Sequence, residues 1–260
     1  MLLPRVLTAL VGIPLLLWLV HAGGTAFSLF VVGVCALCCY EYALILRLGG
    51  RPVQAAPVVL VGGALAAGTA LGGPFPLALA AGVVLVALVE LFSKVHSMDR
   101  AALTLFGALF AGWMPSHLAL IRDLRPHGEG FVVLVFLSVW ATDTAGYFAG
   151  RAFGRNALAA EVSPKKTWEG AVAGIAAAVA TALLVQRFGL REALSPLHAA
   201  ALGAAIGVIG QVSDLAESMI KRDAGVKDSG ALLPGHGGVF DRFDSYILAA
   251  PAVYYALSFR

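Results

Sequence analysis

Charged residues are scarce in this sequence. Lys, Arg, Asp and Glu make up 13% of its 260 residues, whereas 60% are hydrophobic. A soluble domain carries about 25% charged residues, and so small a polar share cannot cover a water-exposed surface. The composition therefore excludes a soluble globular protein and indicates a polytopic membrane protein. We expect an all-α fold, because lipid offers no partner for open backbone groups.

Cysteine is almost absent as well. The three cysteines, Cys35, Cys38 and Cys39, lie in one apolar run. Cys35 and Cys38 form a CxxC pair, but neither a second pair nor a nearby histidine completes a zinc set. We therefore expect small side chains packed in a membrane helix rather than a metal or redox centre.

Nine apolar stretches approach the length of about 20 residues that a helix needs to cross a bilayer. They lie at about residues 4–20, 26–46, 57–72, 75–92, 101–121, 131–150, 168–187, 197–220 and 244–259. The alternative is eight spans, with 57–72 and 75–92 forming a re-entrant hairpin. We expect the first stretch to remain a span rather than act as a secretory signal. Glycine pairs four residues apart, such as Gly146/Gly150 and Gly170/Gly174, favour close helix packing.

Basic residues are placed unevenly between the two sides of these nine spans. Thirteen Lys and Arg residues fall on the side of the N-terminus, and five fall on the other side. An excess of Lys and Arg marks the cytoplasmic side, so the N-terminus is predicted in the cytoplasm and the C-terminus outside. We expect residues 1–130 to form a first group of spans. Residues 131–260 are expected to form a second group, joined by the two long cytoplasmic loops.

Two of the predicted helices carry acidic side chains near their cytoplasmic ends. Asp143 lies eight residues before Arg151, and Asp214 lies seven residues before Lys221. At a rise of 1.5 Å per residue, both carboxylates lie about 10–12 Å below the basic loops. A purely structural role is the alternative for Asp143 and for Glu217, which lies in the turn after Asp214. Each carboxylate would then serve only as a buried hydrogen-bond or ion-pair partner. Carboxylates in a membrane are nevertheless rare without a function.

The segment 221–243 combines glycine with charges of both signs. It has four glycines within nine residues, and glycine lets phosphate oxygens approach the backbone closely. Asp241 and Asp244 follow at the start of the last predicted helix. Carboxylates on both sides of a glycine loop, with Lys and Arg between them, suit Mg²⁺ bridged to nucleotide phosphates. A loop that only anchors the helices is the alternative, but anchoring needs neither the glycines nor the acids.

The other cytoplasmic loop ends in Ser163, Lys165, Lys166 and Thr167, just before a predicted helix. Two lysines and two hydroxyls at a helix N-terminus suit an anion. Paired lysines at a membrane surface also bind lipid headgroups. This segment alone therefore does not distinguish a binding site for a substrate anion from a contact with lipid.

These segments closely resemble the phosphatidate cytidylyltransferases, also called CDP-diacylglycerol synthases. The resemblance lies in the runs TDTAGY at 142–147 and SPKKTWEG at 163–170, and in the segment from Ser218 to Asp244 with its Lys-Arg, Lys-Asp, His-Gly-Gly and Asp-Arg-x-Asp elements. Ser213 stands where the family usually has glycine, and a proline expected near Ala160 is missing. Neither departure removes a charged group.

The resemblance implies a nine-span enzyme of the inner membrane, expected to be a homodimer with its active site facing the cytoplasm. On this basis residues 1–130 would form the scaffold, with lipid access and dimer contacts, and residues 131–260 would carry the cytoplasmic catalytic loops. It would convert CTP and phosphatidate from the bilayer into CDP-diacylglycerol and pyrophosphate with Mg²⁺, a second cation being left open. No nucleic-acid partner is expected. The metal candidates are Asp214, Asp241, Glu217 and Asp244, of which the family pattern implies the first two. The further catalytic candidates are Lys221, Lys227 and His236, and His236 could equally hold the loop. The substrate-binding candidates are Ser163, Lys165, Lys166, Thr167, Ser218, Arg222, Gly237, Gly238, Arg242 and Asp143.

Two other classes of protein share parts of this pattern. A CTP-dependent polyprenol kinase would use similar substrates but would release CDP. A secondary transporter of organic anions would also keep carboxylates in its membrane helices. Such a transporter should have broken helices at the midplane and pseudo-symmetric halves, whereas the glycine loop here lies at one membrane face.

Overall fold

The computed structural model describes residues 2–227, 229–230 and 237–259. Within this part of the chain, helices occupy all nine stretches predicted as spans. They are α1 (Leu2–Ala22), α2 (Gly24–Leu48), α3 (Ala55–Ala70), α4 (Phe75–Leu91), the segment from α5 (Met98–Gly107) to α6 (His117–Arg122), α7 (Gly128–Phe153), α8 (Trp168–Gly189), α9 (Pro196–Asp223) and α10 (Phe240–Ser258). Between α5 and α6 the chain passes through a π-helical stretch, η1 (Ala108–Trp113), and a short 3₁₀ turn, η2 (Met114–Ser116).

Among the described residues, five helical segments are long and apolar enough to cross a membrane. They are Gly24–Leu48, Met98–Arg122, Gly128–Phe153, Trp168–Gly189 and Pro196–Asp223. The apolar parts of α1, α3 and α4 are shorter. The helices confirm the expected all-α membrane protein, while the number of crossings stays a prediction.

One short hairpin departs from the purely helical expectation. Strands β1 (Ala157–Ala159) and β2 (Ser163–Thr167) pair antiparallel, with Ala157 opposite Thr167 and Ala159 opposite Ser163. The hairpin lies in the loop between two predicted spans, so the lipid rule that favours helices does not apply to it.

The chain divides into two compact units. The first consists of Met1–Leu120 with Ile220–Phe243, and the second consists of Ile121–Met219 with Asp244–Arg260. This division rests on compactness alone, and the functional division expected at residue 130 stays a prediction.

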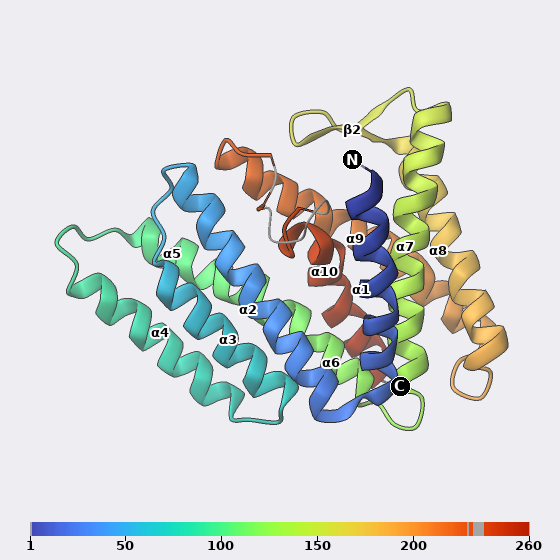
Figure 1. Ribbon diagram of the computed structural model, residues 1–260, viewed down its shortest axis with the longest axis horizontal. Coiled ribbons are helices and arrows are strands. Elements are labelled where there is room, and N and C mark those ends of the chain that lie inside the picture. The colour runs from blue at the N-terminus through green and yellow to red at the C-terminus, as the bar shows by residue number, and fades with distance from the viewer. Residues whose placement is uncertain (1, 228, 231–236, 260) are drawn as a thin grey trace. The chain divides into compact units, whose positions relative to one another are not determined.

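In the first unit, α2, α3 and α4 lie side by side (Figure 1). Val61, Leu65, Val86 and Ala108 form a buried cluster among α3, α4 and η1. Helix α2 buries all three cysteines, each 0% exposed, as expected for small packing residues. Helix α3 and η1 pack through glycine. A Cβ atom on Gly112 would lie 2.5 Å from the Cα atom of Gly62, so the two backbones meet without side chains between them.

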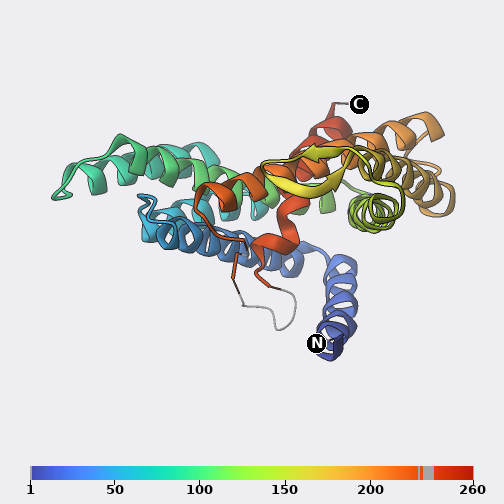
Figure 2. The same ribbon diagram turned by 90° about the horizontal axis from the view of Figure 1, so that it is seen from above.

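In the second unit, α8 packs along α7 through the predicted glycine pairs. A Cβ atom on Gly170 would lie 2.7 Å from the carbonyl oxygen of Gly146, and one on Gly174 would lie 2.9 Å from that of Thr142. The hairpin β1–β2 contacts α8, and β2 also contacts α7 (Figure 2). Close helix packing therefore fixes where β2 meets the ends of the two helices.

Candidate active site

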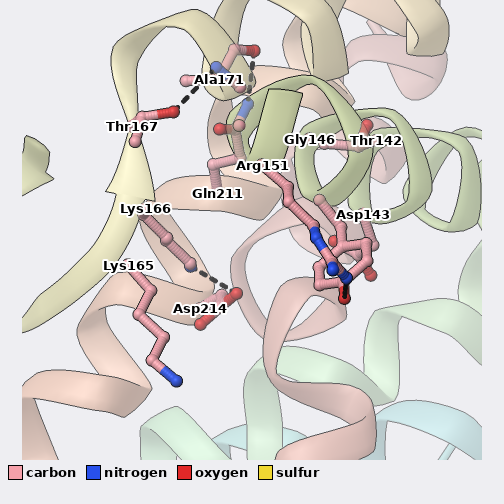
Figure 3. A pocket seen from close by; sticks show the side chains of 13 residues that line it. Thr142, Asp143, Gly146, Arg151, Lys165, Lys166, Thr167, Ala171, Gln211 and Asp214 are labelled. Atoms are coloured by element: carbon pink, nitrogen blue, oxygen red, sulfur yellow. Dashed lines mark hydrogen bonds and ion pairs between the residues drawn. The ribbon is translucent and has the colours of Figure 1, made fainter. Parts of the chain in front are cut away.

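A cavity of about 540 Å³ opens in the second unit where α7, β2, α8 and α9 meet. Its lining combines acids, bases and small residues from all four elements (Figure 3). The lining residues are Thr142, Asp143, Gly146, Tyr147, Gly150, Arg151, Lys165, Lys166, Thr167, Gly170, Ala171, Gln211 and Asp214. The structure thus brings five candidate residues, Asp143, Lys165, Lys166, Thr167 and Asp214, to one hollow.

One face of α7 supplies the first wall of the cavity. Asp143, Tyr147 and Arg151 follow one another at intervals of four residues, so they lie on the same side of the helix. Arg151 donates a hydrogen bond from Nη1 to the hydroxyl of Tyr147 at 3.2 Å. This wall therefore places a guanidinium group, a phenol and a carboxylate along one line.

The end of β2 supplies the basic wall. Thr167 caps α8, since its hydroxyl accepts a hydrogen bond from the backbone N–H of Gly170 at 3.2 Å. The cap fixes the direction of the two preceding residues. Lys166 forms an ion pair with Asp214, and Figure 3 shows its ammonium group pointing toward that carboxylate, with Lys165 beside it. Amines at the start of a helix suit the binding of phosphate.

An acidic cluster lies next to this wall. Asp214, Glu217 and Asp244 each offer a carboxylate oxygen, and these oxygens lie within 4.8 Å of one another. Glu217 is 0% exposed, and the Ser218 hydroxyl donates to Asp214 at 3.4 Å. Carboxylates this close repel one another unless a cation or proton neutralises them.

The donor set of this cluster fits a magnesium ion. Mg²⁺ binds oxygen ligands at about 2.1 Å, so two oxygens on one ion lie at most about 4.2 Å apart. The observed separation needs only small side-chain adjustments to reach that limit. The cluster contains three of the four predicted metal ligands: Asp214, Glu217 and Asp244.

Ser213 fixes the position of Asp244 within this unit. Its buried hydroxyl donates to the carbonyl oxygen of Asp244 and accepts from the N–H of Leu248 at 3.1 Å. The hydroxyl thus contacts two backbone groups one helical turn apart in α10. The serine that replaces the family's usual glycine therefore joins α9 to the first turns of α10.

The fourth predicted ligand, Asp241, belongs to the first unit. Lys221 Nζ lies 2.7 Å from its Oδ1 atom, and both side chains are only 12% exposed. The N–H groups of Ser229 and Gly238 donate to its Oδ2 atom at 3.0 and 3.3 Å. Asp241 is thus held by a charge and two backbone groups of the segment that precedes α10.

The remaining candidates are placed as follows. Arg222, Lys227 and Arg242 are exposed in the first unit, and Arg222 donates to the carbonyl of Val226 at 3.2 Å. Gly237 has φ = 81°, a left-handed conformation that favours glycine. Ser163 lies at the far end of β2, opposite Ala159. His236 lies outside the described residues.

Sequence reasoning missed Glu41, which is 2% exposed in α2. Its carboxylate accepts hydrogen bonds from the Ser229 hydroxyl at 3.1 Å and from the N–H groups of Val239 and Phe240 at 3.0 and 2.7 Å. The sequence did contain a signal for Glu41. It is an acidic residue within a predicted span, and the rarity of such residues in membrane helices is what singled out Asp143.

Comparisons with known proteins find similar sequences over nearly the whole length of this chain. The sequence profile of the "Cytidylyltransferase family" matches residues 3–260. The chain is 37% identical to the phosphatidate cytidylyltransferase of Brucella suis over 259 residues, covering 96% of this chain and 91% of that protein. It is 33% identical to the phosphatidate cytidylyltransferase of a Synechocystis species, covering 96% and 94%. It is also 33% identical to the phosphatidate cytidylyltransferase of Bacillus subtilis, covering 70% of this chain and 67% of that protein.

Proposed function

This chain belongs to the cytidylyltransferase family, and on that premise we propose that it converts CTP and phosphatidate into CDP-diacylglycerol and pyrophosphate. The relatives that cover almost all of it carry the name of this activity. The observation that carries the proposal is the cavity in which Lys165 and Lys166 meet Asp214. A site for two phosphate-bearing substrates needs cationic groups, and a substrate held in the bilayer suits a protein in the membrane.

The reaction needs no nucleophile from the protein. A phosphate oxygen of phosphatidate attacks the α-phosphorus of CTP, the bond from that phosphorus to the bridging oxygen breaks, and pyrophosphate leaves with the electron pair. The protein has to bring two polyanions together and to stabilise the charge that develops. Lys165, Lys166 and Arg151 are the cations that the cavity offers for this task. Fixed charges aimed at the reacting phosphates stabilise the transition state more than the ground state.

We assign the carboxylates to magnesium. Asp214, Glu217 and Asp244 would hold Mg²⁺, which would supply positive charge to the phosphate oxygens and to the leaving pyrophosphate. A second cation stays open. Asp241 is also a proposed ligand, on the basis of the family pattern, and it lies three residues before Asp244 in α10. Asp143 is a proposed substrate contact on the opposite wall.

The other basic candidates are proposed as phosphate contacts from their place in the family pattern. They are Lys221, Arg222, Lys227 and Arg242. Ser163, Thr167, Ser218, Gly237, Gly238 and His236 complete the proposed set. In this assignment Lys166 has two partners in turn. It pairs with Asp214 before the substrate binds, and it transfers to a phosphate group afterwards.

We further propose nine membrane crossings in the bacterial inner membrane, with the N-terminus and the active loops in the cytoplasm. The bias of thirteen basic residues against five supports this orientation. A homodimer is proposed from the family resemblance alone. A cytoplasmic site suits the substrates, since CTP arrives from the cytosol and phosphatidate from the bilayer.

Product analysis tests the activity. Purified protein is incubated with phosphatidate, CTP and Mg²⁺, and both pyrophosphate and CDP-diacylglycerol are measured, with an EDTA control. We expect equal amounts of the two products and none with EDTA. Release of CDP together with a phosphorylated polyprenol, on addition of the alcohol, would instead support the kinase alternative.

A further inference from the structure

We propose that Glu41 is a positioning residue, which fixes the segment before α10 and thereby presents Asp241 in one geometry. This inference rests on the proposed function, in which Asp241 is a proposed magnesium ligand. It does not rest on the family pattern, because Glu41 lies outside the motifs that carry the resemblance. All the contacts that support it lie within the first unit.

The Glu41 carboxylate joins Ser229 to the residues at the start of α10. Its Oε2 atom accepts from the Ser229 hydroxyl and from the N–H of Phe240, and its Oε1 atom accepts from the N–H of Val239. The two backbone donors belong to the N-terminal end of α10, where N–H groups lack partners within the helix. A negative charge is favourable at that end of a helix. Glu41 therefore caps α10 from a different helix.

The same pieces of chain hold Asp241. Ser229 donates its hydroxyl to Glu41 and its backbone N–H to Asp241. Gly238 also donates its N–H to Asp241, and it lies directly before the residues bound by Glu41. The two carboxylates thus share one scaffold, with Lys221 on the far side of Asp241.

The packing leaves little freedom for another arrangement. A Cβ atom on Gly238 would overlap the Ser229 hydroxyl and the Glu41 carboxylate. Glu41 and Ser229 are each 2% exposed, so water cannot replace the carboxylate as hydrogen-bond acceptor. If the carboxylate is lost, buried donors lose their partner and the segment has to rearrange. A displacement of about 1 Å at a catalytic group can lower turnover about 100-fold.

The test compares two substitutions of buried carboxylates. Glu41→Gln keeps the shape of the side chain but places an NH₂ group against N–H donors. Glu90→Gln is the matched control. Glu90 is 7% exposed and pairs with Arg100 at 2.7 Å in the same unit, away from the segment before α10. Both variants are expected to unfold at lower temperature than the wild type.

Two measurements separate positioning from general stability. In Glu41→Gln, hydrogen–deuterium exchange in the peptide that contains residues 239–240 should become about tenfold faster, the effect of losing about one hydrogen bond. Its kcat should fall about 10- to 100-fold, and more Mg²⁺ should be needed for half-maximal rate. In Glu90→Gln, the exchange of that peptide, kcat and the Mg²⁺ requirement should stay within about twofold of wild type.

Three outcomes overturn the inference: unchanged exchange at 239–240 in Glu41→Gln, faster exchange with unchanged kcat, or the same loss of kcat in Glu90→Gln. If Glu41→Gln does not fold, Ser229→Ala replaces it. Ser229→Ala removes one of the three hydrogen bonds to Glu41 and should give smaller changes in the same direction. If neither the exchange at 239–240 nor kcat changes in Ser229→Ala, the inference is overturned. A wild type that makes no CDP-diacylglycerol refutes the proposed function instead, and the exchange measurement still decides whether Glu41 holds this segment.

Discussion

Replacing Asp214 with asparagine removes one charge from the centre of the proposed site. Asp214 offers an oxygen to the acidic cluster with Glu217 and Asp244, and it also pairs with Lys166 across the cavity. Asparagine has nearly the same shape, so the substitution isolates the role of the charge. We expect Asp214→Asn to reduce turnover at least about 100-fold, which corresponds to about 2.7 kcal/mol of lost transition-state stabilisation.

The same substitution should have little effect on folding. The side chains of Lys166 and Asp214 are 27% and 25% exposed, and the loss of such a partly exposed ion pair costs less than about 1 kcal/mol. The loss of one carboxylate from a group of three also relieves repulsion between like charges. The unfolding temperature without divalent cations should therefore stay the same or rise slightly. The stabilisation that Mg²⁺ gives the wild type should be greatly reduced.

The assay records pyrophosphate release against Mg²⁺ concentration, together with the unfolding temperature with and without Mg²⁺. Glu192→Gln is the control, because Glu192 is an exposed acid in the loop between α8 and α9 of the same unit. It should behave as the wild type in both measurements. Turnover of Asp214→Asn close to that of the wild type at limiting Mg²⁺ would refute the assignment of this residue.

Three further substitutions, one of them with a matched control, test other parts of the second unit. Lys166→Ala should lower kcat/KM for CTP about 10- to 100-fold by removing a charge-assisted contact, and an unchanged value would exclude Lys166 from substrate binding. Gly170→Ala should lower the free energy of unfolding by about 1–3 kcal/mol, because its Cβ atom would lie 2.7 Å from the Gly146 carbonyl. Gly189→Ala, where a Cβ atom meets nothing within 4 Å, should not lower it in the same thermal melts. Ser213→Ala removes a buried hydroxyl that bonds to Asp244 and should cost about 1–3 kcal/mol, with a parallel fall in kcat. An unchanged unfolding temperature would show that this link between α9 and α10 does not contribute to stability.

The helices could be predicted from the sequence because composition decides them. A membrane segment must satisfy its own backbone, so an apolar stretch of sufficient length is helical wherever it occurs. The glycine pairs Gly146/Gly150 and Gly170/Gly174 indicated close helix packing, but only the structure shows that they pack α7 against α8. The hairpin at 157–167 depends on pairing of the apolar strand Ala157–Ala159 with the polar strand Ser163–Thr167, for which the sequence carries no comparable signal.

The cavity could be predicted in part. Equal depth below two basic loops placed Asp143 and Asp214 at the same level, and the structure brings both to one cavity with Lys166. Depth does not specify which carboxylates of neighbouring helices meet. The sequence put Asp214, Glu217, Asp241 and Asp244 in one candidate metal set, and the structure groups Asp214, Glu217 and Asp244 in the second unit. The contacts of Asp241 in the first unit, with Lys221 and backbone N–H groups, required the structure.

Glu41 shows most clearly what the sequence leaves open. Its partners Val239 and Phe240 lie about 200 residues further along the chain, at separations of 198 and 199. A buried acid in an apolar helix indicates that a partner exists. The identity of the partner depends on how helices pack, and no local pattern records this.

The most direct test of the account is to locate the divalent cation. Crystals grown with CTP and Mn²⁺ in place of Mg²⁺ give an anomalous-difference map in which the metal stands out from the protein atoms. The account predicts a peak within bonding distance of the carboxylate oxygens of Asp214, Glu217 and Asp244, next to the phosphates of CTP. Phosphates bound with the metal at another group of residues, in a protein that remains active with Mn²⁺, would contradict it.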